Sequence, residues 1–219
     1  MTNAIYISTI EAYSGKSVIA LGVVNLLVGK TAKIAFFKPI ISSEGGEKDP
    51  HIDTIASHFN LEMAYEDMFV FTRNEVLRYI NAGKEAYIID TIIQRFKHLQ
   101  ERYDFVVVEG VGGWMVPITA RYFSNDLAVD LRLPAIVVAE NRLGCLNHIM
   151  LTVRAIESAG LKCAGVVLND LAKESDLAMT TNAEILRSCL TLPILAGFDP
   201  AKAELDRRLR QMLPEFHLL

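Results

Sequence analysis

Short hydrophobic runs that recur along the chain constrain its fold more than any other feature. They are rich in Val and Ile, are apolar at consecutive positions and are bounded by Gly, Pro, Asp or Asn; they cover residues 4–7, 33–37, 105–108, 135–139 and 164–168. A strand is apolar at consecutive positions when both of its faces are buried, as in a parallel sheet covered by helices. We therefore expect five buried strands, with a further short strand over residues 192–196.

Segments with helical spacing separate these runs. In two of them apolar residues recur every three to five positions: Val18, Leu21, Val24 and Leu27, and then Met150, Val153, Ile156 and Leu161. Strands that alternate with such helices form a mostly parallel sheet with helices on both faces. The sequence predicts a doubly wound α/β fold, closed by a helix over residues 202–212.

Residues 41–100 follow a different pattern. After a polar loop they carry helical spacing and no clear strand signal before Phe105. We interpret residues 50–102 as a helical insertion in a single domain that spans residues 1–219. A chain of 219 residues with 51% hydrophobic and 22% charged residues suits one well-packed core.

Composition disfavours several classes of protein. The net charge is −4 and the Lys and Arg residues are scattered, so nucleic acid is not an expected partner. The three cysteines lack C-x-x-C spacing, so we expect reduced thiols and neither a disulfide framework nor a zinc site. The first residues show no signal-peptide pattern, and no apolar run reaches the ~20 residues that cross a bilayer. We expect a cytoplasmic protein without a membrane partner.

The stretch STIEAYSGKS, residues 8–17, ends like a phosphate-binding loop. A P-loop has the form G-x-x-x-x-G-K-[ST]; Gly15, Lys16 and Ser17 fit its end, whereas Ile10 stands at the first glycine. The stretch follows the first strand and opens a helix, where backbone N–H groups face phosphates, Lys16 neutralises their charge and Ser17 ligates Mg²⁺. We favour this interpretation over a lysine that merely begins a surface helix.

An acidic and glycine-rich segment follows the strand at residues 105–108. Glu109 ends that strand like a Walker B carboxylate, and ligands of such sheets bind at the carboxyl ends of the strands, so we expect Glu109 near Ser17 and its magnesium. Three glycines among residues 110–113 let the backbone approach a ligand closely. The alternative is an acid at a strand end that faces solvent.

Two further charged residues each leave two interpretations open. Lys38 ends the second strand, where it suits a transferred phosphoryl group or is an ordinary solvated lysine. Asp53 opens a helix over residues 52–59, either as a second magnesium ligand or as an acid that stabilises the helix N-terminus.

The segment from Arg142 to His148 follows the fourth strand and begins a helix. Its free amides can bind an anion, or Asn147 simply caps the helix. Cys145 has no evident base and is a poor candidate for a nucleophile. Trp114 is expected to pack in the core and not to stack on a ligand.

Three motifs in the second half resemble dethiobiotin synthetases. They are V-E-G-V-G-G-W followed by V-P-I over residues 108–118, L-G-C-L-N-H over 143–148 and L-N-D over 168–170, and the matches run from about residue 104 to 198. That family has a P-loop NTPase fold and usually forms homodimers. With ATP and Mg²⁺ it joins carbon dioxide to 7,8-diaminononanoate as a carbamate, phosphorylates the carbamate and closes a ureido ring. The resemblance implies the same activity, cofactors and substrates here.

The resemblance also implies a role for each matching residue. Lys16 and Lys38 would be catalytic and hold the phosphates and the carbamate. The magnesium ligands would be Ser17, Asp53 and Glu109, and Asn169 would read the adenine. The other ATP contacts would be Ser14, Gly15, Lys16, Ser17, Val18, Glu109 and Gly112. The substrate contacts would be Lys38, Ser42, Gly113 and, from a partner subunit, Gly144, Cys145, Leu146 and Asn147.

The first half departs from that family. The family loop usually reads G-T-D-T-x-x-G-K-T; Thr9 falls on its first glycine, where we expect it to restrict a backbone that glycine allows at φ > 0, and Ala12 replaces a threonine that helps at the metal. The P-x-x-P-H substrate segment is missing, and residues 71–76 stand in its region. Residues 5–108 instead resemble the N-terminal P-loop domain of some phosphate acetyltransferases, which implies a non-catalytic nucleotide-sensing module as the alternative. A membrane-surface partitioning ATPase is disfavoured, because Ile10 stands where those proteins carry a lysine.

Overall fold

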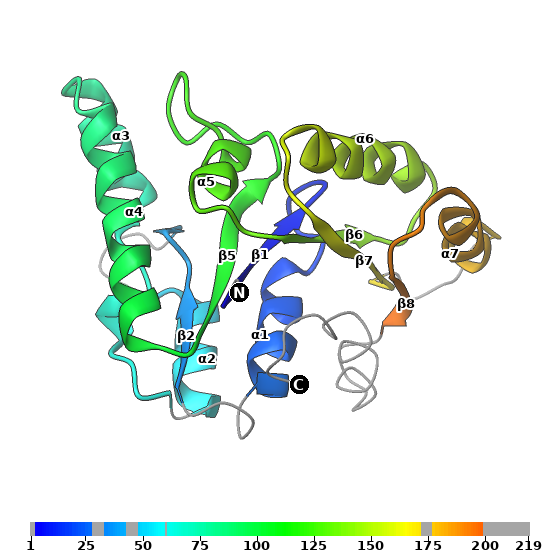
Figure 1. Ribbon diagram of the computed structural model, residues 1–219, viewed down its shortest axis with the longest axis horizontal. Helices are drawn as coiled ribbons and strands as arrows, with labels where there is room; N and C mark the ends of the chain where they lie inside the picture. The colour runs from blue at the N-terminus through cyan, green and yellow to red at the C-terminus, as the bar shows by residue number, and fades with distance from the viewer. Residues whose placement is uncertain (1–2, 28–32, 43–47, 60, 172–176, 199–219) are drawn as a thin grey trace.

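The computed structural model describes residues 3–27, 33–42, 48–59, 61–171 and 177–198. Within these ranges the main sheet has six parallel strands in the order β2-β5-β1-β6-β7-β8. Its strands are β1 (Ala4–Thr9), β2 (Ile34–Phe37), β5 (Phe105–Gly113), β6 (Ala135–Glu140), β7 (Cys163–Asn169) and β8 (Ile194–Phe198). Figure 1 shows α1 (Lys16–Leu27) on one face of the sheet and α5 (Ser124–Asp130) and α6 (Cys145–Ser158) on the other. The predicted doubly wound α/β fold is confirmed; the expected helix over residues 202–212 lies outside the described residues.

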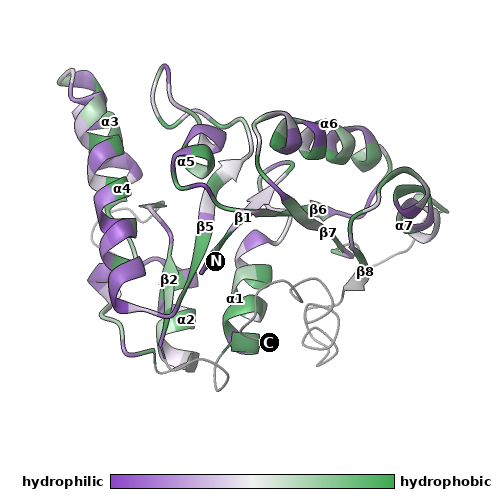
Figure 2. Cartoon of the chain, in the orientation of Figure 1, coloured by the Kyte–Doolittle hydropathy of each residue, from purple (hydrophilic) through white to green (hydrophobic). Residues whose placement is uncertain are grey.

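Burial on both faces explains the apolar runs. Every residue of β1, β2 and β7 is buried, and the central strands and most of α1 are hydrophobic in Figure 2. Two strands run further than the apolar pattern predicts, because polar Thr9 and flexible Gly113 continue the ladder as register partners. A pattern of apolar residues ends at the first polar residue, whereas the backbone hydrogen bonds do not.

Helix α1 is buried around most of its circumference. Ile19, Ala20 and Val23 are buried in addition to Val24, because the helix packs on β1, β2 and β5 and also against α2 (Pro50–Phe59). The apolar stripe read from the sequence was too narrow for a helix in this position.

The segment between β2 and β5 holds short elements that the sequence does not signal. β3 (Ile40–Ile41) and β4 (Phe71–Thr72) form a second, two-stranded parallel sheet, so the expectation of no strand before Phe105 was wrong. The 3₁₀ helix η1 (Tyr65–Asp67), α3 (Arg73–Asn81) and α4 (Glu85–Arg102) complete the segment. Helices α3 and α4 pack on each other, and Figure 1 shows them beside β2, the edge strand of the main sheet.

Two helices in this segment begin with capping side chains. The Thr72 hydroxyl accepts from the Glu75 amide, and the Glu75 carboxylate accepts from the Thr72 amide, which is a complete capping box at α3. Asp49 accepts from the amides of His51 and Ile52 at 3.1 Å each, so α2 begins at Pro50, two residues before the predicted start. Helix α7 (Leu177–Cys189) packs against β8 at the far end of the sheet.

The helices of the described ranges include none that is long and apolar enough to cross a membrane. All three cysteines, Cys145, Cys163 and Cys189, are free thiols.

Candidate functional site

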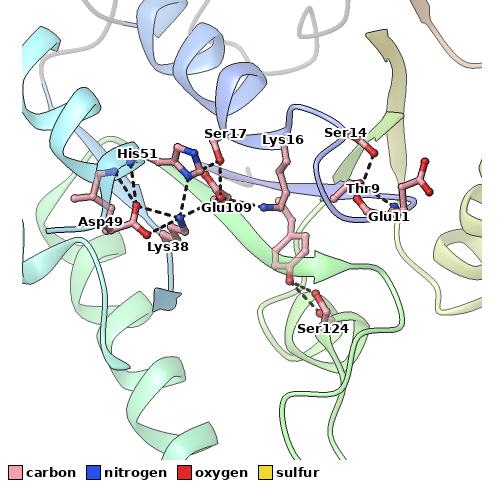
Figure 3. Close-up of polar contacts among 12 residues, drawn as sticks. Thr9, Glu11, Ser14, Lys16, Ser17, Lys38, Asp49, His51, Glu109 and Ser124 are labelled. Carbon is pink, nitrogen blue, oxygen red and sulfur yellow. Dashed lines mark hydrogen bonds and ion pairs between the residues drawn. The ribbon is translucent and has the colours of Figure 1, made fainter. Parts of the chain in front are cut away.

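Three charged side chains meet where β1, β2 and β5 approach the start of α1. Lys16 Nζ lies 3.0 Å from Glu109 Oε1 and Lys38 Nζ lies 3.7 Å from the same oxygen. The Ser17 hydroxyl donates to Glu109 Oε1 at 3.0 Å. Figure 3 shows these side chains converging from the phosphate loop and two strands. The structure thus brings Lys16, Ser17, Lys38 and Glu109 together, as the sequence predicts.

Glu109 is buried, so the alternative of a solvent-facing acid was wrong. It lies within β5, opposite Ile7 of β1, and its side chain is only 1% exposed. Its Oε1 accepts hydrogen bonds from Lys16 and Ser17 and forms a longer ion pair with Lys38, whereas its Oε2 is buried and has no hydrogen-bond partner among the described residues. A buried carboxylate oxygen without a partner is costly, so Oε2 is poised to accept a bond from a ligand or a cation.

Asp49 and His51 join these residues, and the sequence analysis missed both. Asp49 holds Lys38 Nζ at 2.9 Å, and its side chain is 3% exposed. Burial raises the pKa of Asp49, but the hydrogen bonds and charge of Lys38 outweigh burial, so the net pKa is lowered and the carboxylate stays charged. Asp49 precedes a proline at a helix start, a capping signal that points to the residue.

We call Lys16, Ser17, Lys38, Asp49, His51 and Glu109 the polar cluster.

His51 bridges the two halves of the polar cluster. Its Nδ1 lies 3.1 Å from Ser17 Oγ and 3.2 Å from Lys38 Nζ. Because an ammonium group only donates, Nδ1 accepts from Lys38 Nζ, and the single hydrogen of the Ser17 hydroxyl is available either to Nδ1 or to Glu109 Oε1. No pattern in the sequence singles out this histidine.

Asp53 is placed apart from the polar cluster. Its carboxylate pairs with Lys48 Nζ at 3.1 Å, its side chain is 51% exposed, and it does not line the cavity beside Ser17 and Glu109. It lies in the first turn of α2, which fits its second interpretation as an acid near a helix N-terminus.

The phosphate loop takes its unusual backbone angles at Tyr13 and Gly15. Their φ angles are 63° and 85°, and Thr9 is an ordinary strand residue, so the expected strain at Thr9 was wrong. The Thr9 hydroxyl instead bonds the Glu11 carbonyl and accepts from the Glu11 amide at 3.0 Å, which holds the start of the loop. Behind the loop, the amide of Val18 donates to the Gly15 carbonyl at 3.1 Å as α1 begins.

Asn169 lies directly behind this loop and does not line the cavity. It is fully buried at the end of β7, its Nδ2 donates to the Ser14 carbonyl at 3.1 Å, and its Oδ1 has no partner among the described residues. A Cβ added at Gly15 would lie 2.0 Å from Asn169 Nδ2. Adenine recognition by Asn169 therefore stays a prediction.

The glycine run after Glu109 serves close packing within the chain. A Cβ at Gly110 would lie 2.5 Å from the Tyr6 ring, and one at Gly113 would lie 3.2 Å from the Thr9 carbonyl oxygen. Tyr6 also contacts Trp114 edge-to-face, with ring centroids 6.2 Å apart, so the packing role expected of Trp114 fits. Gly110 and Gly112 line the cavity as well, whereas Gly113 does not.

The start of α6 lies apart from the cavity in this chain. Gly144 is the N-cap residue, with φ 88°, so the suggestion that Asn147 caps the helix was wrong. Cys145 is buried, and burial raises the pKa of its thiol, which keeps it neutral and unreactive. Neither these residues nor Leu146 line the cavity, so their contact with a substrate stays a prediction.

An ion pair joins the segment before α6 to the phosphate loop. The Arg142 guanidinium donates from Nη2 to both oxygens of Glu11 at 2.7 Å and from Nε at 3.1 Å. The sequence does not predict this pair, because its two residues are 131 positions apart.

The polar cluster lies at one side of an open cavity of about 550 Å³. Apart from Asp49, the members of the cluster line it, and so does Ser42. The remaining lining is largely apolar and comes from the phosphate loop, the β3–β4 sheet, α3 and the segment after β5, including Ala12, Ile40, Val76, Leu77, Ile80, Val116, Pro117 and Ile118. A cavity with charged groups at one side and aliphatic walls suits a molecule that is part ionic and part hydrocarbon.

This combination of a parallel sheet, a lysine loop at a helix N-terminus and a buried strand carboxylate defines a P-loop nucleotide-binding protein. A family model described as an AAA domain matches residues 3–207. The ATP-dependent dethiobiotin synthetase BioD of Akkermansia muciniphila is 33% identical over 83% of this chain and 84% of its own length. The chain therefore belongs to the AAA domain family and to the family of ATP-dependent dethiobiotin synthetases.

A second similarity covers part of a longer protein. The phosphate acetyltransferase of Nitratidesulfovibrio vulgaris is 33% identical over 77% of this chain, which spans only 25% of that protein. Both resemblances seen in the sequence are thus confirmed. Among solved structures, the septum site-determining protein MinD complexed with Mg-ADP from Pyrococcus horikoshii has a TM-score of 0.55 at 17% identity, covering 98% of this chain and 90% of that one. At that identity the match supports the fold alone.

Proposed function

We propose that the protein is an ATP- and Mg²⁺-dependent ligase that forms a ureido ring from 7,8-diaminononanoate and carbon dioxide through a phosphorylated carbamate. The observation that carries the proposal is the convergence of Lys16 and Lys38 on the buried Glu109 carboxylate, beside a largely aliphatic cavity. The similarity to dethiobiotin synthetases over most of both chains supports it. As in that family, the active form is proposed to be a cytoplasmic homodimer.

The two lysines would supply positive charge next to a transferred phosphoryl group, since both lie beside Glu109 Oε1. Lys38 is held by Asp49 at 2.9 Å and is only 11% exposed, so its position is fixed before a substrate arrives. Lys16 has no second carboxylate in these contacts and exchanges Glu109 for phosphate oxygens when nucleotide binds. Such prepositioned cations stabilise the charge that develops during phosphoryl transfer, with little reorganisation.

The residues present fit a magnesium ion. Glu109 Oε2 is buried without a partner among the described residues, and Ser17 Oγ lies within hydrogen-bond distance of the same carboxylate. Mg²⁺ prefers oxygen ligands and is commonly held by one or two carboxylates together with phosphates and water. When bound, magnesium would neutralise the phosphate charge; Ser17 and Glu109 would hold it.

The test is a turnover assay with purified protein, 7,8-diaminononanoate, bicarbonate, ATP and magnesium. We expect a ureido product with the wild type and a loss of about 100-fold or more in Lys16→Ala, because one prepositioned donor to developing charge is worth that much. Lys97→Ala, an exposed lysine on α4, is the matched control and should retain full turnover. Binding of ATP without any ureido product would refute the ligase proposal and favour the nucleotide-sensing role.

A further inference from the structure

His51 carries an imidazole nitrogen on the cavity, directly beside the two residues that would hold magnesium. The residue is exposed and lines the cavity, and its Nδ1 lies 3.1 Å from Ser17 Oγ. Ser17 Oγ in turn lies 3.0 Å from Glu109 Oε1. Figure 3 shows the ring of His51 next to Ser17 and Glu109. A nitrogen with a lone pair therefore adjoins the two oxygen ligands.

The spacing of these three groups is that of neighbouring ligands on one small cation. Mg²⁺ holds its ligands at about 2.1 Å in octahedral geometry, so two ligands at a right angle lie about 3.0 Å apart. The contacts of Ser17 Oγ with Glu109 Oε1 and with His51 Nδ1 measure 3.0 and 3.1 Å. Both contacts are hydrogen bonds, and a divalent cation can use the same lone pairs.

The acids nearby do not provide a third ligand. Asp53, to which the resemblance gives that role, pairs with Lys48 and does not line the cavity. Asp49 accepts from Lys38 Nζ and from two backbone amides at the start of α2, and it does not line the cavity either.

The cavity lining itself narrows the choice. Of the His, Cys, Asp and Glu side chains in the described part of the chain, only His51 and Glu109 line the cavity. Glu109 Oε2 is a buried oxygen without a partner among the described residues, which shows that the carboxylate has capacity for a further contact. His51 is thus the side chain that can complete a set of three ligands with Ser17 and Glu109.

His51 Nδ1 can turn from Lys38 to a metal ion without isolating that lysine. Lys38 Nζ lies 3.2 Å from Nδ1, but it also donates to both oxygens of Asp49, at 2.9 and 3.1 Å. Lys38 therefore keeps two hydrogen bonds to a carboxylate when Nδ1 is engaged elsewhere. The negative charges of Asp49 and Glu109, both within 3.7 Å of Lys38 Nζ, offset the repulsion between the lysine and an ion.

A nitrogen ligand changes which metal ion a site prefers. Imidazole suits first-row transition ions, whereas Mg²⁺ prefers oxygen ligands. We propose that His51 Nδ1 is a third protein ligand beside Ser17 and Glu109, and that it shifts the selectivity of the site from Mg²⁺ towards a divalent transition ion such as Mn²⁺. This inference rests on the metal site of the proposed function and not on the ligase reaction.

The first experiment is electron paramagnetic resonance of Mn²⁺ bound to the full chain together with β,γ-methylene ATP, whose bridging carbon adds no nitrogen beside the metal. A coordinated imidazole nitrogen modulates the electron spin echo of Mn²⁺. We expect this modulation in the wild type and in His98→Asn, and its loss in His51→Asn and His51→Asp. His98 is the matched control, because it is an exposed histidine on α4 and does not line the cavity.

The second experiment measures selectivity in the same complex, by titrating Mn²⁺ and then displacing it with Mg²⁺. We expect His51→Asn to weaken Mn²⁺ binding at least about 10-fold, since loss of even an outer-shell partner of a metal costs about 10- to 100-fold, and to weaken Mg²⁺ binding less. His51→Asp restores an all-oxygen set of ligands, so the preference for Mn²⁺ over Mg²⁺ should fall by about the same factor.

A wild-type spectrum without imidazole modulation would overturn the inference, and so would modulation that persists in His51→Asn. Equal losses of Mn²⁺ and Mg²⁺ binding in His51→Asn would also overturn it, since they would indicate an indirect effect on the phosphate loop. A wild type that does not retain Mn²⁺ in the complex contradicts it as well. Because neither experiment needs turnover, imidazole modulation without ureido product would refute the proposed function alone, whereas product without modulation would refute this inference alone.

Discussion

Glu109→Gln separates the charge of the buried carboxylate from its shape. Glu109 Oε1 accepts from Lys16 and from Ser17, both at 3.0 Å, and lies 3.7 Å from Lys38 Nζ. The amide oxygen of a glutamine can still accept the two close bonds. Hydrogen bonds to a charged group contribute about 1.5–3 kcal/mol and neutral ones about 1 kcal/mol, so each close contact loses about 1 kcal/mol. We expect the free energy of unfolding to fall by about 2 kcal/mol.

The assay is urea denaturation without nucleotide, read as a change in midpoint at constant slope, since the slope reports the surface exposed on unfolding. A second arm titrates a non-hydrolysable ATP analogue with and without magnesium. Magnesium should strengthen binding to the wild type and have little effect on Glu109→Gln. Glu101→Gln, an exposed acid on α4, is the control and should change stability by less than about 0.5 kcal/mol.

A variant as stable as the wild type, or more stable, would refute the reasoning about the polar cluster. It would mean that the cost of burying the carboxylate cancels its pairing with the lysines, as it does in some buried ion pairs. If stability falls but magnesium still strengthens nucleotide binding, the carboxylate holds the lysines and has no part in holding the metal.

Three further substitutions test the loop, the helix cap and the packing behind the glycines. Gly15→Ala should abolish binding of the ATP analogue and lower thermal stability more than the control Gly83→Ala. Both glycines have positive φ, 85° and 67°, but of the two only Gly15 has a position for Cβ that meets another side chain, at 2.0 Å. Equal effects of the two substitutions in calorimetry would count against this steric argument. Asp49→Asn should destabilise the protein at neutral pH, and the difference in stability from wild type should shrink below about pH 4. The reason is that the lowered pKa of Asp49 gives stability that is present above the unfolded pKa of about 3.9 and is lost as the carboxylate protonates. A difference in urea midpoint that grows on acidification would contradict this reasoning. Gly110→Ala should destabilise by more than about 1 kcal/mol, because its Cβ would lie 2.5 Å from the buried Tyr6 ring, and an unchanged melting temperature would show that the ring can move aside.

The sheet and the phosphate lysine could be predicted because their signals are local. Strands buried on both faces must be apolar at consecutive positions, so β1 and β5 can be recognised as runs of apolar residues. The strands β3 and β4 could not be predicted in this way. Each is two residues long, and β4 is held by contacts with a distant part of the chain: the amide of its first residue, Phe71, donates to the Pro39 carbonyl at 3.2 Å.

The choice between Asp49 and Asp53 shows where local signals end. The two acids are one helical turn apart, and the sequence alone places either at the start of α2. The decision is made by tertiary contacts: the Asp49 amide donates to the Tyr65 hydroxyl at 2.6 Å, and Lys38 takes its carboxylate, while Asp53 is left to the exposed Lys48. Propensity and capping rules locate the start of the helix, but they do not tell which of the two acids joins the polar cluster.

The contacts of the polar cluster also constrain how nucleotide and magnesium bind. Lys16 is paired with Glu109, so a phosphate that binds Lys16 would have to replace this carboxylate. The buried Glu109 carboxylate then loses its Lys16 partner, and this is unfavourable until another cation takes the place of the lysine. Under the proposed function, magnesium at Glu109 would supply that cation, and phosphate would supply ligands that magnesium needs. Each ligand would then remove the penalty that the other incurs, and by linkage each would strengthen the binding of the other by the same factor.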